Sequence, residues 1–339
     1  MKIRTAVILF FIILPCSAHA ISEADYASQY AARVRPLYES GTFGEFAGTD
    51  GLLIKYSAFE HDNETGALII LHGKSESYIK YAELVYDLQD TGLSCYLMDF
   101  RGFGFSERLL DDDSQKVYVD SFDDYVEDLQ TFIDDIVMAK PHAKLFILAH
   151  SMGGCIAARY LEKNPDSLDA AILNSPMLQI NTGSYPPSVA YAIASLATTL
   201  GMGAHYALGQ GPRDDPYFFD ATTTHSYARW STWEEDLIPN NPVIRSGGAT
   251  YSWVKRSMET GAFARREAAR VATPVLLLQA EEDTFVRQEG QDSFCDRAQD
   301  CTPVFFYGSR HEILMETDAI RNPALNTIKS FLGKHLKAE

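Results

Sequence analysis

From residue 41 onward, short apolar runs alternate with segments whose apolar residues recur every three or four positions. Continuous apolar runs are typical of strands buried on both faces of a sheet, and the wider spacing is typical of amphipathic helices. The predicted strands are Ala67–His72, Ser94–Asp99, Lys144–Ala149, Leu168–Asn174, Pro274–Gln279 and Pro303–Tyr307. The predicted helices are Tyr78–Asp90, Phe122–Ala139, Gly154–Lys163, Gln288–Arg297 and Ala319–His335. Repeated strand–helix units of this length predict an α/β fold with a mostly parallel sheet covered by helices on both faces.

Two β-rich segments precede this pattern, and one long segment interrupts it. Phe43–Phe46 and Leu52–Phe59 flank a turn-like stretch at 48–51, which predicts an antiparallel hairpin. Residues 179–270 are rich in Ala, Tyr, Pro and Gly, and a structureless loop of that length is implausible inside a compact domain. We therefore expect a helical insertion with a small core of its own at 179–270, between two parts of the α/β region at 21–178 and 271–339.

Composition narrows the class of protein. The 339 residues are 46% hydrophobic and 22% charged, which fits an ordinary folded protein and excludes collagen, a disordered tail and a disulfide knot. Lys and Arg total 29 against 46 Asp and Glu, for a formal charge of −17. Nucleic acid is not an expected partner, because phosphate-backbone binding needs a clustered basic face.

The first twenty residues resemble a signal peptide. Lys2 and Arg4 form a basic start, Thr5 to Pro15 is apolar, and Ala18 and Ala20 supply small residues two positions apart. We expect cleavage after Ala20 and export to the periplasm or the medium, with a retained anchor as the alternative, although the apolar run is shorter than the roughly 20 residues that span a bilayer. Cleavage removes two positive charges, so the charge of −17 becomes −19.

The cysteines have no metal-binding spacing, and we expect neither a metal nor a cofactor. Cys95 and Cys155 lie in apolar stretches and are expected to be buried free thiols. Cys295 and Cys301 bracket a short polar stretch. Whether this pair forms a disulfide is left open, because the geometry decides it.

Ser151 is the strongest candidate for a catalytic residue. It follows the apolar run KLFIL and precedes Gly153 and Gly154 at the start of a predicted helix. Such a strand-to-helix turn presents a serine Oγ to solvent, and the helix N-terminus adds free backbone N–H groups. The usual glycine two residues before the serine is Ala149 here. The alternative interpretation is a serine that only caps the helix.

A serine nucleophile needs a base and an acid that holds the base in place. His311 follows the strand PVFFY, and Glu282 and Asp283 follow the strand TPVLLLQ, each at a carboxyl strand end. Ser151, Asp283 and His311 occur in the chain order that this fold requires. Asp283 is our choice for the acid, and Glu282 remains an alternative because one residue of turn geometry separates them.

When the serine attacks a carbonyl, a tetrahedral intermediate forms, and its oxyanion needs two backbone N–H donors. We expect one from Met152, directly after the serine, and one from Lys74, in the loop after the first parallel strand. Gly73 in that loop allows close approach of the backbone.

Six segments carry a resemblance to a known family. They are LHGKSESYIKYAELVYDL, MDFRGFGFSERLL, FILAHSMGG, GGATYSWVKRS, LLLQAEED and GSRHEILMETDA. The chain resembles the bacterial lysophospholipase family, a branch of the α/β-hydrolases similar to monoglyceride lipases, over roughly residues 40 to 335. The resemblance implies an α/β-hydrolase core with a cap, Ser151 as nucleophile, Asp283 as acid, His311 as base, and Lys74 and Met152 as oxyanion donors.

The expected activity is hydrolysis of the fatty-acyl ester of lysophospholipids through an acyl-enzyme. The alternatives are a monoacylglycerol lipase or general carboxylesterase, a peptidase that uses cap acids such as Glu234 and Glu235, and a non-catalytic binding protein. The expected partner is a small amphiphilic lipid, with transient membrane contact through the cap; acyl length, headgroup and oligomeric state stay open. Trp230, Trp233 and Tyr251 are candidate substrate-binding residues, although aromatic residues of a cap can equally form its core.

Overall fold

The computed structural model describes residues 20–213, 219 and 223–337. The predicted signal peptide falls on residues 1–19 and lies outside this range, with Ala20 the first described residue. Among the described residues, no helix is long and apolar enough to cross a membrane.

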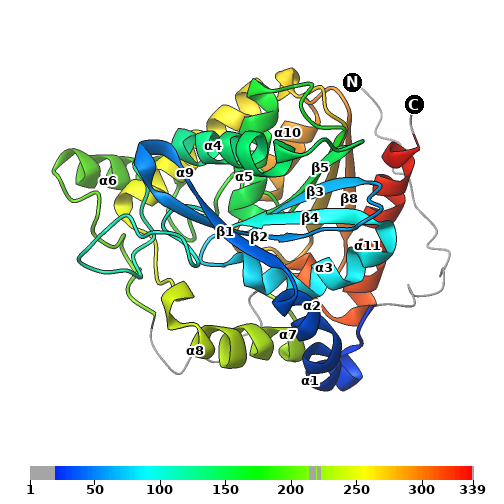
Figure 1. The fold of residues 1–339 in the computed structure, drawn as a ribbon. Helices are drawn as coiled ribbons and strands as arrows, with labels where there is room; N and C mark the ends of the chain where they lie inside the picture. Colours follow the sequence, from blue (N-terminus) through cyan, green and yellow to red (C-terminus); the bar gives the residue numbers. More distant parts are fainter. Residues whose placement is uncertain (1–19, 214–218, 220–222, 338–339) are drawn as a thin grey trace.

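An eight-stranded sheet in the order β1-β2-β4-β3-β5-β6-β7-β8 forms the centre of the molecule (Figure 1). The strands are β1 Thr42–Ala47, β2 Leu53–Phe59, β3 Gly66–Leu71, β4 Leu93–Met98, β5 Leu145–His150, β6 Ala170–Asn174, β7 Val275–Ala280 and β8 Cys301–Phe306. β1 and β2 form the predicted antiparallel hairpin, β2 pairs antiparallel with β4, and the pairs from β4 to β8 are parallel. The prediction of a mostly parallel α/β fold is therefore confirmed.

Helices cover both faces of the sheet (Figure 1). They are α1 Tyr26–Gln29, α2 Arg35–Glu39, α3 Ala82–Leu88, α4 Phe122–Thr131, α5 Ser151–Lys163, α6 Pro187–Thr199, α7 Tyr227–Ser231, α8 Ile238–Asn240, α9 Tyr251–Glu267, α10 Gln288–Cys295 and α11 Asp318–Leu336. Alternate residues of β3 face opposite layers: Ile69 packs in the core cluster with residues of α4 and α5, and Ile70 packs in the cluster with residues of α3 and α11. This is why the strand is apolar throughout, since a strand covered on both faces has no polar side.

The segment between β6 and β7 departs from the prediction in one respect. It is helical, as expected, with α6, α7, α8 and α9 along its length. However, several of its buried side chains join the clusters of the main body: Trp253 packs in the cluster above the sheet, and Trp233 and Ile238 pack in the cluster below it. Trp230 instead packs within the segment, with its ring centroid 5.2 Å from that of Phe219 and 5.5 Å from that of Tyr227. The insertion therefore does not bury all its apolar side chains in a core of its own, because some of them reach the main body and bury their surface there.

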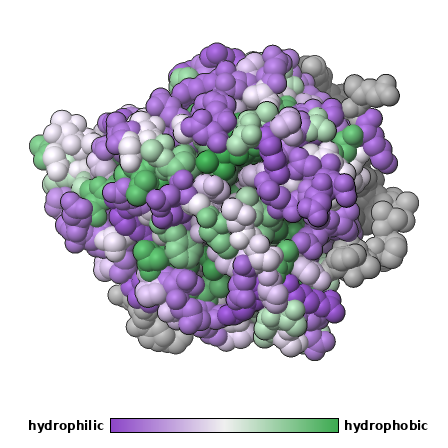
Figure 2. All heavy atoms as spheres, in the orientation of Figure 1, coloured by the Kyte–Doolittle hydropathy of each residue, from purple (hydrophilic) through white to green (hydrophobic). Residues whose placement is uncertain are grey.

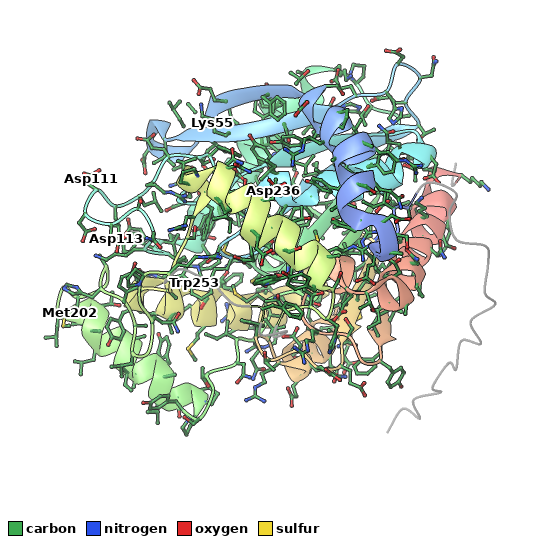
Figure 3. The ribbon with its side chains drawn as sticks, turned by 90° about the horizontal axis from the view of Figure 1, so that it is seen from below. Lys55, Asp111, Asp113, Met202, Asp236 and Trp253 are labelled. Carbon is green, nitrogen blue, oxygen red and sulfur yellow. A yellow bond between two sulfur atoms is a disulfide. The ribbon has the colours of Figure 1, made fainter. Side chains whose placement is uncertain are left out.

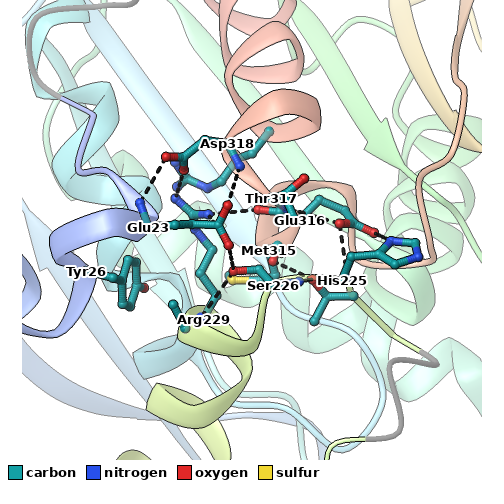
Figure 4. A network of polar contacts seen from close by, with 12 residues as sticks. Glu23, Tyr26, His225, Ser226, Arg229, Met315, Glu316, Thr317 and Asp318 are labelled. Carbon is teal, nitrogen blue, oxygen red and sulfur yellow. Dashed lines mark hydrogen bonds and ion pairs between the residues drawn. The ribbon is translucent and has the colours of Figure 1, made fainter.

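A polar network around Arg229 of α7 links the N-terminal segment at Glu23 to the insertion and to the last helix (Figure 4). Arg229 Nη2 lies 3.0 Å from Glu83 Oε1 and 2.8 Å from Asp318 Oδ1, and Nη1 donates to the Glu316 carbonyl at 2.8 Å. Glu23 accepts a hydrogen bond from Ser226 Oγ at 2.5 Å. The Arg229 and Glu83 side chains are fully or almost fully buried, and each charge is compensated by the other together with a second partner, Asp318 for Arg229 and Arg321 for Glu83.

A disulfide joins Cys295, the last residue of α10, to Cys301, the first residue of β8. This answers the question that the sequence left open. Cys95 and Cys155 are buried free thiols, as expected.

Candidate active site

Ser151 lies at the sharp turn between β5 and α5. Its φ is +49°, a left-handed conformation that is uncommon for a residue other than glycine. The turn packs against the segments that directly follow β3 and β6: a Cβ on Gly153 would lie 2.6 Å from the His72 carbonyl oxygen, and one on Gly154 would lie 2.8 Å from Pro176 Cβ. The two small residues after the serine therefore let the helix start against the neighbouring strand ends.

Ser151, His311 and Asp283 form one hydrogen-bonded chain. His311 Nε2 lies 2.9 Å from Ser151 Oγ, and His311 Nδ1 lies 2.6 Å from Asp283 Oδ2. The other carboxylate oxygen of Asp283 accepts from the backbone N–H groups of Phe285 at 2.8 Å and Val286 at 3.0 Å, which fixes the acid. The structure thus brings together the three residues that the sequence placed at separate strand ends.

Glu282, the alternative acid, takes a different position. Its side chain is 48% exposed and faces His225 at 3.5 Å and Arg310 at 3.6 Å. Its backbone N–H donates to the Ser309 carbonyl at 2.8 Å, so the turn directs the two neighbouring acids to opposite sides. In this geometry Asp283 is the acid that contacts the histidine.

The electrostatics of the pair suit a general base. Burial lowers the pKa of His311, but the adjacent Asp283 carboxylate and its hydrogen bond raise it by more, and the net pKa lies above the usual range. For Asp283, burial raises the pKa, but His311 and two backbone N–H donors lower it by more, so the acid stays ionised. An ionised carboxylate on Nδ1 leaves Nε2 free to accept the serine proton.

The loop after β3 lies beside the serine. A Cβ on Gly73 would come within 3.3 Å of Ser151 Cβ, and the Lys74 backbone N–H makes no hydrogen bond to any part of the chain that the structure describes. Met152 is the second residue of α5, where backbone N–H groups have no partner within the helix. Both predicted oxyanion donors therefore belong to segments beside Ser151, and their N–H groups are free to bind an oxyanion.

Sequence reasoning missed the carboxylate that holds this loop. Glu76 is buried and accepts from Gly73 N–H at 2.7 Å, Tyr81 OH at 2.7 Å and Lys80 Nζ at 2.7 Å. Lys80 also contacts Glu312, the residue after the histidine, at 2.8 Å. Burial raises the pKa of Glu76, but the Lys80 ammonium lowers it by more, so it remains an anion. The sequence signal for this cluster was the four-residue spacing of Glu76 and Lys80. This spacing is common on exposed helices, so it does not indicate a buried ion pair.

A second histidine, His150, packs against the base. The centroids of the His150 and His311 rings are 4.8 Å apart, and His150 Nδ1 contacts the Asn174 carbonyl at 3.2 Å. Burial lowers the pKa of His150 to about 3, so this ring is neutral beside the catalytic pair.

A cavity of about 1140 Å³ opens above Ser151 and His311. Gly73, Lys74 and Met177 line it together with the catalytic pair, and so do all three candidate substrate-binding residues, Trp230, Trp233 and Tyr251. In Figure 2, hydrophobic residues show in the hollow middle of the visible face with hydrophilic residues around them. The described residues contain no group of three His, Cys, Asp or Glu side chains placed to hold a metal ion.

Comparison with known proteins identifies the family. Residues 62–318 match the family described as "Serine aminopeptidase, S33". The chain is 37% identical over 304 residues to lysophospholipase L2 of Escherichia coli strain K12, covering 86% of this chain and 87% of that protein. The chain belongs to this family.

More distant relatives agree with that assignment. The chain is 23% identical to human monoglyceride lipase, over 79% of this chain and 82% of that protein. The crystal structure of a soluble monoglyceride lipase variant from Saccharomyces cerevisiae superposes with a TM-score of 0.68 at 19% identity, over 88% of this chain and 96% of that chain. The resemblance to bacterial lysophospholipases and monoglyceride lipases is confirmed, and so is the α/β-hydrolase fold.

Proposed function

We propose that the protein hydrolyses the fatty-acyl ester of lysophospholipids through an acyl-enzyme on Ser151. The observation that carries the proposal is the hydrogen-bonded chain from Ser151 through His311 to Asp283, of which Ser151 and His311 line the cavity. A serine, a base and an oriented acid in contact are the arrangement that nucleophilic acyl transfer requires.

Each side chain has one task in the reaction. His311 Nε2 takes the Ser151 proton as Oγ attacks the ester carbonyl, and the backbone N–H groups of Lys74 and Met152 stabilise the oxyanion. Protonated His311 then gives its proton to the departing glycerol oxygen. Water repeats the sequence on the acyl-enzyme and releases the fatty acid. Asp283 stabilises the imidazolium throughout.

The substrate class rests on the relatives and on the cavity. The names lysophospholipase L2 and monoglyceride lipase recur among the similar proteins, and both describe enzymes of single-chain lipids. The aromatic walls formed by Trp230, Trp233 and Tyr251 provide an apolar surface for an acyl chain. A monoacylglycerol lipase or general carboxylesterase would use the same triad and is the alternative.

A peptidase is less well supported, although the family description names an aminopeptidase. Recognition of a free N-terminus needs an available carboxylate, but the carboxylates that line the cavity in the described part of the chain are paired: Glu234 with Arg213, and Glu76 and Glu312 with Lys80. The other cap acid considered, Glu235, accepts from Tyr227 OH and does not line the cavity.

Fatty-acid release tests the proposal. Wild-type protein and Ser151→Ala should be assayed with lysophosphatidylcholine, a monoacylglycerol of the same acyl chain and a short chromogenic ester. We expect cleavage of the lysophospholipid and a loss of at least about 10⁴-fold in the variant. A preference for monoacylglycerol would favour the alternative enzyme. If no ester were cleaved, the remaining interpretation would be a non-catalytic binding protein.

We also propose that residues 179–270 act as the cap and touch lipid surfaces transiently through α6. This helix and the loops around it expose large apolar side chains: Tyr185, Val189, Tyr191, Leu196, Leu200, Met202 and Leu208. Figure 3 shows Met202 at the margin of the molecule beside α6. Leu196→Asp with Leu200→Asp should reduce sedimentation with phosphatidylcholine vesicles, and Leu53→Asp, at an exposed leucine of β2, is the control. Equal sedimentation of both variants would contradict the proposal.

Export with cleavage after Ala20 is likewise a proposal. The basic start and the apolar run support it, and a disulfide such as Cys295–Cys301 is typical of proteins from oxidising compartments. N-terminal sequencing of the protein recovered from the periplasm or the medium should begin at Ile21. A protein that keeps Met1 and sediments with membranes would indicate the retained anchor.

A further inference from the structure

The cationic side chains that line the cavity differ in how they are compensated. Those of the described residues are Lys74, Lys80, Arg213 and Arg229. Lys80 bridges two carboxylates, Arg213 pairs with Glu234, and Arg229 contacts Glu83. These pairs cancel charge inside the protein, so they leave little attraction for a ligand.

Lys74 has no such partner among the residues that the structure describes. Its Nζ donates to Ser75 Oγ at 3.2 Å and lies 5.7 Å from the centre of the Trp253 ring, and no carboxylate of the described residues lies within ion-pair distance of it. Burial lowers the pKa of Lys74 to about 8, with no carboxylate raising it. An ammonium in such a place is stabilised when an anion arrives, because the anion replaces the lost hydration.

The position of Lys74 relative to the triad indicates which part of a substrate it meets. Its backbone N–H is the proposed oxyanion donor, so its side chain begins beside the ester carbonyl. In a lysophospholipid the phosphate is attached to the same glycerol that carries the ester and leaves with it. The flexible Lys74 side chain starts beside the ester carbonyl and ends in the cavity. Its ammonium group can therefore reach the phosphate of the glycerophospho leaving group.

We propose that Lys74 Nζ binds the headgroup phosphate and thereby favours lysophospholipids over neutral monoacylglycerols. This inference rests on the proposed function. It assigns the side chain a role separate from that of the backbone N–H of the same residue. Because the chain carries a net charge of −17, an anionic group has few favourable places on this protein, and an uncompensated cation beside the nucleophile is one of them.

The test compares two substrates in each variant. The quantity is the ratio of kcat/KM for lysophosphatidylcholine to kcat/KM for the monoacylglycerol of the same chain length, because the ratio cancels any common effect on the oxyanion donor. We expect Lys74→Gln to lower the ratio at least tenfold and Lys74→Arg to restore most of it. Lys55→Gln, which removes an exposed charge on β2 far from Trp253 (Figure 3), should leave the ratio unchanged. An unchanged ratio in Lys74→Gln overturns the proposal.

A binding measurement separates this inference from the proposed function. Inhibition of a short chromogenic ester by an uncleavable ether lysophospholipid and by the matching alkylglycerol needs no lipid hydrolysis. Loss of the phosphate-dependent part of the affinity in Lys74→Gln supports the role of Lys74 even if lysophospholipids prove poor substrates. Equal inhibition by both ethers in the wild type overturns it. Competition by inorganic phosphate as strong as that of the ether lysophospholipid would indicate a simple anion site and overturn the headgroup assignment.

Discussion

Replacing Gly153 by alanine tests whether the serine turn must stay in contact with β3. The new Cβ would lie 2.6 Å from the His72 carbonyl oxygen and 3.0 Å from Leu71 Cβ. The first pair must separate by about 0.8 Å to reach an ordinary contact of 3.4 Å. β3 cannot retreat, because it is hydrogen-bonded to a strand on each side, so the start of α5 must move instead.

Two effects of this shift can be measured. Overpacking costs about 1–3 kcal/mol, and the better helix propensity of alanine offsets about 0.5–1 kcal/mol of it. For a chain of this length, a net loss of about 1–2 kcal/mol lowers Tm by only a few degrees. Activity should suffer more, because misplacing a reacting group by about 1 Å costs about 10²-fold. We therefore expect kcat for a short ester to fall at least about tenfold.

Calorimetry and ester hydrolysis on the same preparation check this expectation. The matched control is Gly333→Ala in α11, where a new Cβ meets nothing within 4 Å. It should keep full activity and raise stability by about 0.5–1 kcal/mol, as alanine does in a helix. If Gly153→Ala matched the wild type in both Tm and kcat, the argument that β3 fixes the serine would be refuted.

Burial lowers the pKa of His311, but Asp283 raises it by more, so the net pKa lies above 6.5. Because the neutral ring is the active base, activity should rise as the pH rises through this pKa. A pH profile of kcat/KM with its acid limb below 6.5 would contradict this. Asp283→Asn should lower kcat for ester hydrolysis about 10³–10⁴-fold, because Asp283 contacts the base. Glu282→Gln should keep full activity, because Glu282 is half-exposed and lies away from the base. Equal losses in the two variants would refute the assignment of Asp283 as the acid. Arg229→Met leaves Glu83 with Arg321 as its one remaining buried cationic partner among the described residues and should cost up to about 3–5 kcal/mol, visible as a lower Tm by calorimetry. An unchanged Tm would show that the Arg229–Glu83 ion pair is dispensable.

Much of the active site could be predicted from the sequence because the fold places strand ends together. Ser151, Asp283 and His311 each follow an apolar strand, and parallel strands deliver their carboxyl ends to one edge of the sheet. The choice between Asp283 and Glu282 could not be made in this way. It depends on the hydrogen bonds that shape a single turn, among them the one from Glu282 N–H to Ser309.

Features that depend on the docking of distant segments escaped prediction. The buried cluster around Glu76 requires Glu312, which lies far along the chain and comes near only when the sheet has formed. The insertion was expected to have a small core of its own, yet Trp233 and Trp253 pack with the main body on opposite sides of the sheet. Local periodicity predicts which residues are buried in an element, but not which neighbour covers them.

The shared core has a consequence for building chimeras of related hydrolases. Because Trp233 and Trp253 fill space between strands and helices of the body, the insertion is not an exchangeable module. A graft cut at residues 179 and 270 would remove these two indoles from the host and leave voids in both layers, each costing about 3–5 kcal/mol for a side chain of that size. Transfer of specificity between relatives therefore has to carry the contacting body residues along with the insertion.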